Sequence, residues 1–116
     1  MTIDVTALKK LMDLVGGEPE DLEEFIEDFT EIAPDLVADM RHGLDAQDWD
    51  KVRISAHTLK SNAKDLGAPA LSKLCETLEH DCRDQAYANA PELVAEIGTA
   101  QMAALAALAQ INPAEI

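Results

Sequence analysis

The residue types best able to do chemistry gather between Lys51 and Lys64. This segment contains His57 and four basic residues, and it has no Asp or Glu. At about 100° per residue in a helix, Arg53, His57, Lys60 and Lys64 fall on one stripe. An imidazole can act as a nucleophile near neutral pH, and neighbouring cations attract an anion such as phosphate. The segment therefore predicts an exposed histidine on a locally cationic surface that can receive an anionic group.

A second stripe of the same segment is apolar and predicts the helix that holds this histidine. Its members recur at helical spacing: Val52, Ala56, Leu59, Ala63 and Leu66. Asp48 suits the N-cap of such a helix, and Gly67 suits its C-terminal cap. Pro69 then favours the start of a further helix. One face of the helix is expected to be buried, which leaves the His57 stripe in solvent.

Residues 57–68, HTLKSNAKDLGA, resemble the signature of histidine-containing phosphotransfer (HPt) domains, roughly H-x-L-K-G/S-x-x-x-x-L-G. Ser61 stands where many members have Gly, and Asn62 stands where many have Ser or Ala. The resemblance covers this motif and the amphipathic helix after it, and the other expected helices are compatible with it. It implies a helical bundle in which His57 is the phosphoacceptor.

The resemblance also implies roles for residues near His57. Lys60 matches the motif lysine, which would steady a phosphoryl group or meet acidic residues of a partner. Small Ser61 leaves room above the ring. We assign phosphate or partner binding to these positions and to three others: Lys64, Arg53 and Gly67. The alternative for each basic residue is an ordinary solvated charge on a helix surface.

Glu79, twenty-two residues after His57, occupies a family position that often carries Gln. In the family this polar side chain accepts the Nδ1 proton of the histidine, so that Nε2 points outward. Glu79 borders the apolar stripe of its own helix and is expected to reach across to the ring. The alternative is a surface carboxylate. His42 and His80 have no basic or ligand-like neighbours and are expected to be solvated.

The resemblance implies a phosphorelay intermediate rather than an enzyme. His57 would take a phosphoryl group from the aspartyl phosphate of a response-regulator receiver domain and pass it to another receiver aspartate. The expected partners are receiver domains and a hybrid histidine kinase. No cofactor is expected on this chain, and Mg²⁺ would belong to the receiver. A different class of function stays open, in which a helical adaptor binds a receiver or kinase through the same face without being phosphorylated.

The periodicity of the whole chain predicts an all-α fold, an antiparallel up-and-down four-helix bundle with an additional short N-terminal helix, in one domain over residues 1–116. The expected segments are 3–15, a long helix from Pro19 that continues through Pro34 with a kink or a one-turn break, and then 49–66, 70–87 and 93–111. Thr2 or Asp4 would cap the first helix, Gly16-Gly17 would end it, and residues 43–48 would form the turn after the long helix.

Composition excludes several classes of function. The formal net charge is −14, and residues 1–50 contain fifteen acidic and three basic residues, so nucleic acid would be repelled. No apolar run is long enough for a membrane span, and the first residues lack the layout of a signal peptide, so a cytoplasmic protein is expected. No set of Cys, His and Asp has the spacing of metal ligands, no Ser/His/Asp arrangement is arguable, and no nucleotide-binding signature is present. A hydrolytic or metal enzyme is disfavoured because the inward positions are almost all apolar.

Cys75 and Cys82 lie seven residues apart in a helical pattern. Their Cα atoms would be about 10.5 Å apart at the helical rise per residue, which excludes a disulfide between them while the helix is intact. Both fall on an apolar face. We expect two buried free thiols that pack as small hydrophobic side chains.

Overall fold

The computed structural model describes residues 3–116 and is entirely helical over that range. Five α-helices follow one another: α1 (Val5–Val15), α2 (Pro19–Ala46), α3 (Trp49–Asp65), α4 (Pro69–Arg83) and α5 (Ala90–Leu108). A short 3-10 helix, η1 (Pro113–Glu115), ends the chain. The expected all-α bundle with an extra N-terminal helix is confirmed.

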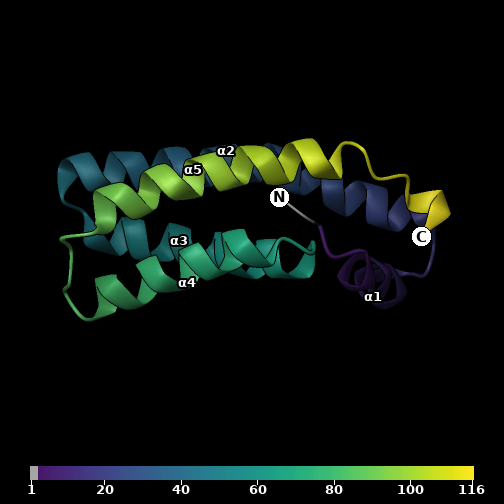
Figure 1. Cartoon of the computed structure of the whole chain (residues 1–116), viewed down its shortest axis with the longest axis horizontal. Coiled ribbons are helices and arrows are strands. Elements are labelled where there is room, and N and C mark those ends of the chain that lie inside the picture. Colours follow the sequence, from purple (N-terminus) through teal and green to yellow (C-terminus); the bar gives the residue numbers. More distant parts are fainter. Residues whose placement is uncertain (1–2) are drawn as a thin grey trace.

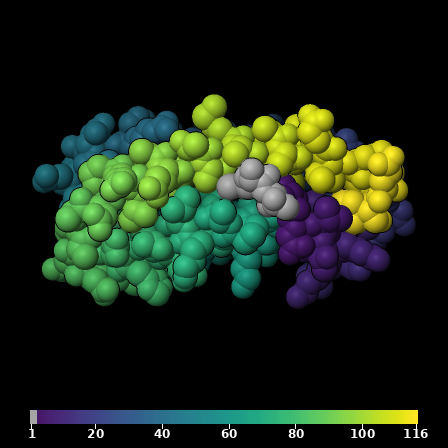
Figure 2. All heavy atoms as spheres, viewed as in Figure 1, coloured from purple at the N-terminus to yellow at the C-terminus, as the bar shows by residue number. Residues whose placement is uncertain are grey.

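The four long helices form an antiparallel bundle of two pairs. α2 and α5 run side by side along one edge, α3 and α4 along the other, and α1 lies at the end of the bundle where η1 also sits (Figure 1). α3 contacts α2 and α4, and α5 contacts the same two helices, so α3 and α5 occupy diagonal corners. The molecule is elongated, 43 × 22 × 20 Å, and its surface is continuous over the helices in the space-filling view (Figure 2).

The core is aliphatic because the chain has few aromatic residues. The largest fully buried side chains are Leu8, Leu22, Met40, Leu59, Leu66, Leu71, Leu78, Ile97 and Leu108. All five residues of the apolar stripe expected on α3 are buried. Cys75 and Cys82 are buried and free, as expected from their place on the apolar face of α4.

Helix ends follow the capping chemistry of the sequence. The side chain of Asp4 accepts from the amide of Thr6, and Asp48 accepts from the amide of Lys51, so both act as N-caps. α1 ends at Gly16, whose φ of 148° is open to glycine. Thr2, the other expected cap of α1, lies outside the described residues.

The long helix α2 is continuous through Pro34, so the one-turn break, one of the two expected outcomes, does not occur. The expected turn at residues 43–48 is wrong in its first part, because α2 continues to Ala46 and only Gln47 and Asp48 connect it to α3. Gly43 stays helical and buried, and a Cβ there would lie 2.8 Å from Cγ2 of Val52. Glycine at this position serves close packing of α2 on α3 rather than chain reversal.

The bounds of α4 and α5 also differ from the expected ones by about one helical turn. α4 ends at Arg83 rather than near Tyr87, and α5 runs from Ala90 to Leu108 rather than over 93–111. Tyr87 lies beyond the end of α4, and its ring stacks on Trp49, with centroids 4.0 Å apart and planes 3° apart. The stack joins the first residue of α3 to the α4–α5 loop at the end of the bundle remote from α1.

Candidate functional site

The site lies where α3 packs against α4. His57 and Lys60 are one turn apart on α3, and Glu79 and Arg83 are one turn apart on α4. The hydroxyl of Ser72 on α4 donates to the backbone carbonyl of Lys60 at 3.0 Å, which fixes the two helices against each other beside the site. Helical periodicity therefore supplies both pairs, and the packing of two helices brings them together.

The carboxylate of Glu79 is the centre of the site and is fully buried. Its Oε2 lies 2.6 Å from Nδ1 of His57 and 2.9 Å from Nη2 of Arg83, and its Oε1 accepts from Nζ of Lys60 at 2.6 Å. A buried carboxylate is stable only when such partners replace its lost hydration. Three nitrogen donors from two helices satisfy both oxygens.

These contacts keep Glu79 ionised. Burial by itself raises the pKa of a carboxyl group, but the hydrogen bonds from Lys60 and His57 and the charges of Lys60 and Arg83 outweigh it, so the pKa of Glu79 lies below its usual value of 4.5. An ionised carboxylate can only accept hydrogen bonds. Nδ1 of His57 must therefore carry the proton in the bond to Glu79.

The other ring nitrogen of His57 is the one left for chemistry. The His57 side chain is 55% exposed, and within residues 3–116 Nε2 has no hydrogen-bond partner. When the ring is neutral and Nδ1 carries its proton, the lone pair lies on Nε2. The arrangement presents a nucleophilic nitrogen to solvent from a ring that a buried group holds in orientation.

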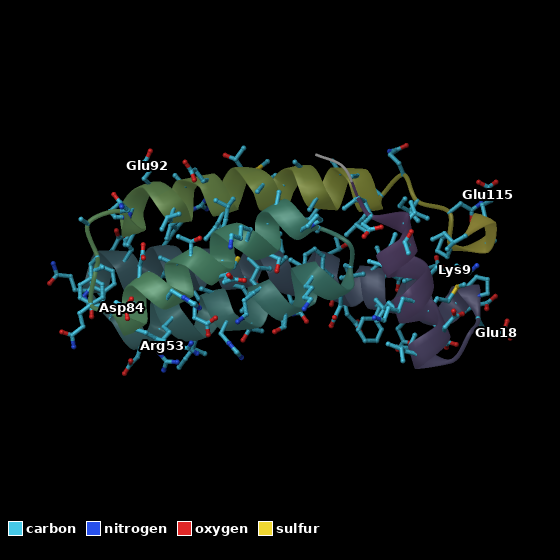
Figure 3. All side chains as sticks on the ribbon, turned by 60° about the horizontal axis from the view of Figure 1, so that its bottom comes forward. Lys9, Glu18, Arg53, Asp84, Glu92 and Glu115 are labelled. Carbon is cyan, nitrogen blue, oxygen red and sulfur yellow. The ribbon has the colours of Figure 1, made fainter. Side chains whose placement is uncertain are left out.

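Three other residues expected to bind phosphate or a partner lie on α3 outside the cluster around Glu79. Ser61 is exposed one turn after His57, and its hydroxyl donates to the His57 carbonyl at 3.4 Å. Lys64 is exposed one turn further along the same face. Arg53 is half-buried, lies 3.9 Å from Asp50, and in Figure 3 sits at the outer edge of the bundle. None of these three contacts Glu79 among the described residues.

Gly67 lies away from the site and has a packing role. Its φ is +75°, and its carbonyl accepts from the amide of Asp4 at 2.7 Å. A Cβ at this position would lie 2.5 Å from the carbonyl oxygen of Asp4. Gly67 therefore ends α3 and lets the chain before α1 approach closely, and the structure shows no anion-binding role for it.

Sequence reasoning missed Arg83 as a member of the site. Its signal was present, because Arg83 follows Glu79 by four residues on a helix, and that spacing places an acid and a base side by side. The sequence also placed Glu79 at the border of the apolar stripe, whereas the structure places it inside the core. Packing against Lys60 explains the difference, since that lysine brings the counter-charge that burial requires.

Comparisons with known proteins agree with this arrangement. The sequence model of the Hpt domain matches residues 24–111. A crystal structure of histidine-containing phosphotransfer protein B (HptB) from Pseudomonas aeruginosa PAO1 shares the fold, with a TM-score of 0.86 and 19% sequence identity over 98% of this chain and 96% of that chain. Among curated proteins, no match was found. No helix in residues 3–116 has the length and apolar character needed to cross a bilayer.

Hpt domains are phosphocarriers that work with receiver domains and kinases in two-component phosphorelays, rather than enzymes with an ATP site of their own. The family match extends from the first turns of α2 to the residues after α5 and so includes the whole α3–α4 site. The chain belongs to the Hpt domain family.

Proposed function

We propose that this chain is a phosphorelay intermediate in which Nε2 of His57 takes a phosphoryl group from the aspartyl phosphate of a receiver domain and gives it to the aspartate of another receiver. The observation that carries the proposal is the bond between Nδ1 of His57 and the ionised, buried Glu79. This bond fixes both the tautomer and the orientation of an exposed ring.

The transfer is a displacement at phosphorus. The lone pair of Nε2 attacks the phosphorus atom, the bond from phosphorus to the aspartyl oxygen breaks, and the aspartate leaves as a carboxylate. The reverse sequence delivers the group to the next receiver. Mg²⁺ and the acidic cluster that binds it belong to the receiver in both steps, and this chain does not phosphorylate itself.

Glu79 supports the transfer by stabilising positive charge on the ring. When Nε2 gains a phosphoryl group, the ring becomes cationic unless Nδ1 loses its proton. A carboxylate 2.6 Å from Nδ1 favours that cation through a charge-assisted hydrogen bond. Lys60 has ammonium protons beyond the one bound to Glu79, so it can contact an oxygen of the bound phosphoryl group while still compensating the buried charge.

The test is phosphoryl acceptance from phosphorylated receiver domains, with wild type and His57→Gln compared. Wild type should acquire phosphate that is lost in acid and kept in alkali, as expected of phosphohistidine, and His57→Gln should acquire none. His42 and His80 are both exposed, so His42→Gln and His80→Gln serve as matched controls that should accept phosphate normally. Unphosphorylated wild type that still binds the receivers would favour the adaptor instead.

A further inference from the structure

The second half of α5 is unlike the rest of this protein. Residues 97–114 contain no Asp, Glu, Lys, Arg or His, although 28% of the chain is charged and its net charge is −14. The labelled acids Glu92 and Glu115 lie toward the two ends of this stretch in Figure 3. A stretch of this length without charge is uncommon in such an acidic protein, and its exposed side marks a candidate contact region.

One exposed stripe runs along α5 through this region and begins just before it, at Ala95. Ala95, Thr99, Met102, Ala106 and Ala109 are all exposed, and their spacing of three or four residues places them on one side of α5. Met102 is 69% exposed and projects from a stripe that is otherwise made of small side chains. We call this stripe, together with the groove beside it, the α5 face.

The groove lies between α2 and α5 and has a volume of about 270 Å³. Its lining residues are Pro34, Val37 and Arg41 from α2, with Gly98, Gln101, Met102 and Leu105 from α5. Gly98 keeps it open at one end, since a Cβ there would lie 2.6 Å from Nη2 of Arg41. Within residues 3–116, Arg41 makes no ion pair.

The buried side chain of Gln101, which lines this groove, has an acceptor oxygen that receives no hydrogen bond from residues 3–116. Gln101 is 5% exposed, and its Nε2 donates to the carbonyl of Gly98 at 3.3 Å. Its Oε1 has no partner in the described part of the chain. Buried polar atoms are nearly always satisfied, so an unpaired acceptor in a groove indicates that a donor comes from outside.

We propose that the α5 face pairs with the α5 face of a second copy of this chain. Two copies of charge −14 repel each other, so the surface at which they touch must be free of acids, and residues 97–114 provide that surface. A two-fold contact also requires one patch to carry both a projection and a hollow. Here Met102 is the projection and the groove beside it is the hollow.

Other properties of the α5 face suit this pairing. Small residues along the stripe let two helices approach closely, and the flexible thioether of Met102 adapts to the shape of a hollow. The face also carries a donor of the kind that Gln101 lacks, the exposed side-chain amide of Gln110. Because α5 lies diagonal to α3, the pairing leaves His57 of both copies accessible.

The experiment is sedimentation equilibrium of the full chain over rising protein concentration at low and high salt. We expect a monomer–dimer equilibrium whose association strengthens with salt, because ions screen the repulsion between two acidic copies. Met102→Glu should raise the dimer dissociation constant at least about tenfold, which corresponds to about 1.4 kcal/mol. Ala106→Glu is a second variant on the same stripe and should act in the same direction.

Leu14→Glu on α1 is the matched control, because Leu14 is 76% exposed and the change adds the same charge far from the α5 face. It should alter the dissociation constant less than about twofold. A chain that remains monomeric throughout overturns the proposal and leaves the face free for another protein. A dimer that Met102→Glu and Leu14→Glu weaken equally also overturns the proposal. Phosphoryl acceptance by Met102→Glu should equal that of wild type, which separates this test from that of His57.

Discussion

Glu79 is fully buried, and yet its carboxylate lies 2.6 Å from His57, whose ring is more than half exposed. The hydrogen bond between them connects the core of the bundle to its surface. Because the buried carboxylate of Glu79 holds the His57 ring through Nδ1, the ring keeps its orientation without any contact on its exposed side, where a partner would approach.

Replacement of Glu79 by Ala should slow phosphoryl transfer without abolishing it, since the nucleophile remains and only its tautomer and orientation are lost. Glu79→Gln should lose much less activity, because an amide oxygen can still accept the Nδ1 proton. ¹⁵N NMR of the His57 ring should show mostly the Nδ1–H tautomer in wild type and a mixture in Glu79→Ala. Equal spectra and equal transfer rates in the Ala variant and wild type would make the carboxylate a bystander.

Lys60 should matter for folding as well as for transfer. Its ammonium compensates the buried Glu79, so Lys60→Ala should lower the free energy of unfolding by about 1–3 kcal/mol. Lys64→Ala is the matched control on the same helix face and should change it by less than about 0.5 kcal/mol. Thermal melts followed by circular dichroism measure both. If the two variants melt alike, the Lys60–Glu79 contact contributes nothing to stability.

Acid should remove the contribution of Glu79. The pKa of Glu79 is lower in the folded protein than the usual 4.5, so the folded state favours the ionised form. The resulting stabilisation is fully present above that usual value and is lost as pH falls through the folded pKa. The difference in unfolding free energy between wild type and Glu79→Gln should therefore shrink below about pH 4.5. A difference that stays constant down to the acid transition would contradict this linkage.

The thiol of Cys75 should be inert in the folded protein. Burial, followed by the negative charge of Glu79, raises its pKa from 9.0 to about 12. The thiolate is the reactive form, so alkylation by iodoacetamide at pH 8 should be far slower in native protein than in denaturant. Between the two pKa values the unfolded chain releases a proton that the folded chain keeps, so stability should fall as pH rises above about 9. Cys75→Ala should lack this alkaline loss.

Gly67→Ala should destabilise the junction of α1 with α3. The position has φ +75°, and a Cβ would meet the backbone of Asp4 at 2.5 Å, which a backbone shift alone can relieve. We expect a loss of at least about 1 kcal/mol in the free energy of unfolding. Gly17→Ala has a similar positive φ with nothing within 4 Å and serves as the control. Hydrogen exchange at Asp4 should accelerate only in the first variant.

The sequence predicted the bundle because helical periodicity and capping residues act locally. Asp4, Asp48 and Gly16 each cap the helix that their chemistry indicates. Gly43 shows where local reasoning fails, since glycine often ends a helix but here permits close contact with Val52 on a neighbouring helix. Tyr87 lies beyond α4 and stacks on a partner thirty-eight residues earlier, which no local pattern encodes.

The site was predictable where it depends on one helix or on the family resemblance. His57 and its basic stripe follow from one helix, and the reach of Glu79 followed from a family resemblance. The burial of Glu79 did not follow, because it depends on three nitrogen donors that come from both helices at once. Arg83 belongs to this set through its spacing from Glu79, a relationship that the sequence contained and that the prediction did not use.

The stacked pair of Trp49 and Tyr87 is an intrinsic fluorescence reporter for one end of the bundle. Each is the sole residue of its type in the chain, and they connect the start of α3 to the α4–α5 loop at one end of the bundle. The excitation energy of a tyrosine passes efficiently to a tryptophan in contact with it, so a wide separation of the two rings restores tyrosine fluorescence. Opening of this end can thus be followed in unlabelled protein, independently of events at His57 and α1.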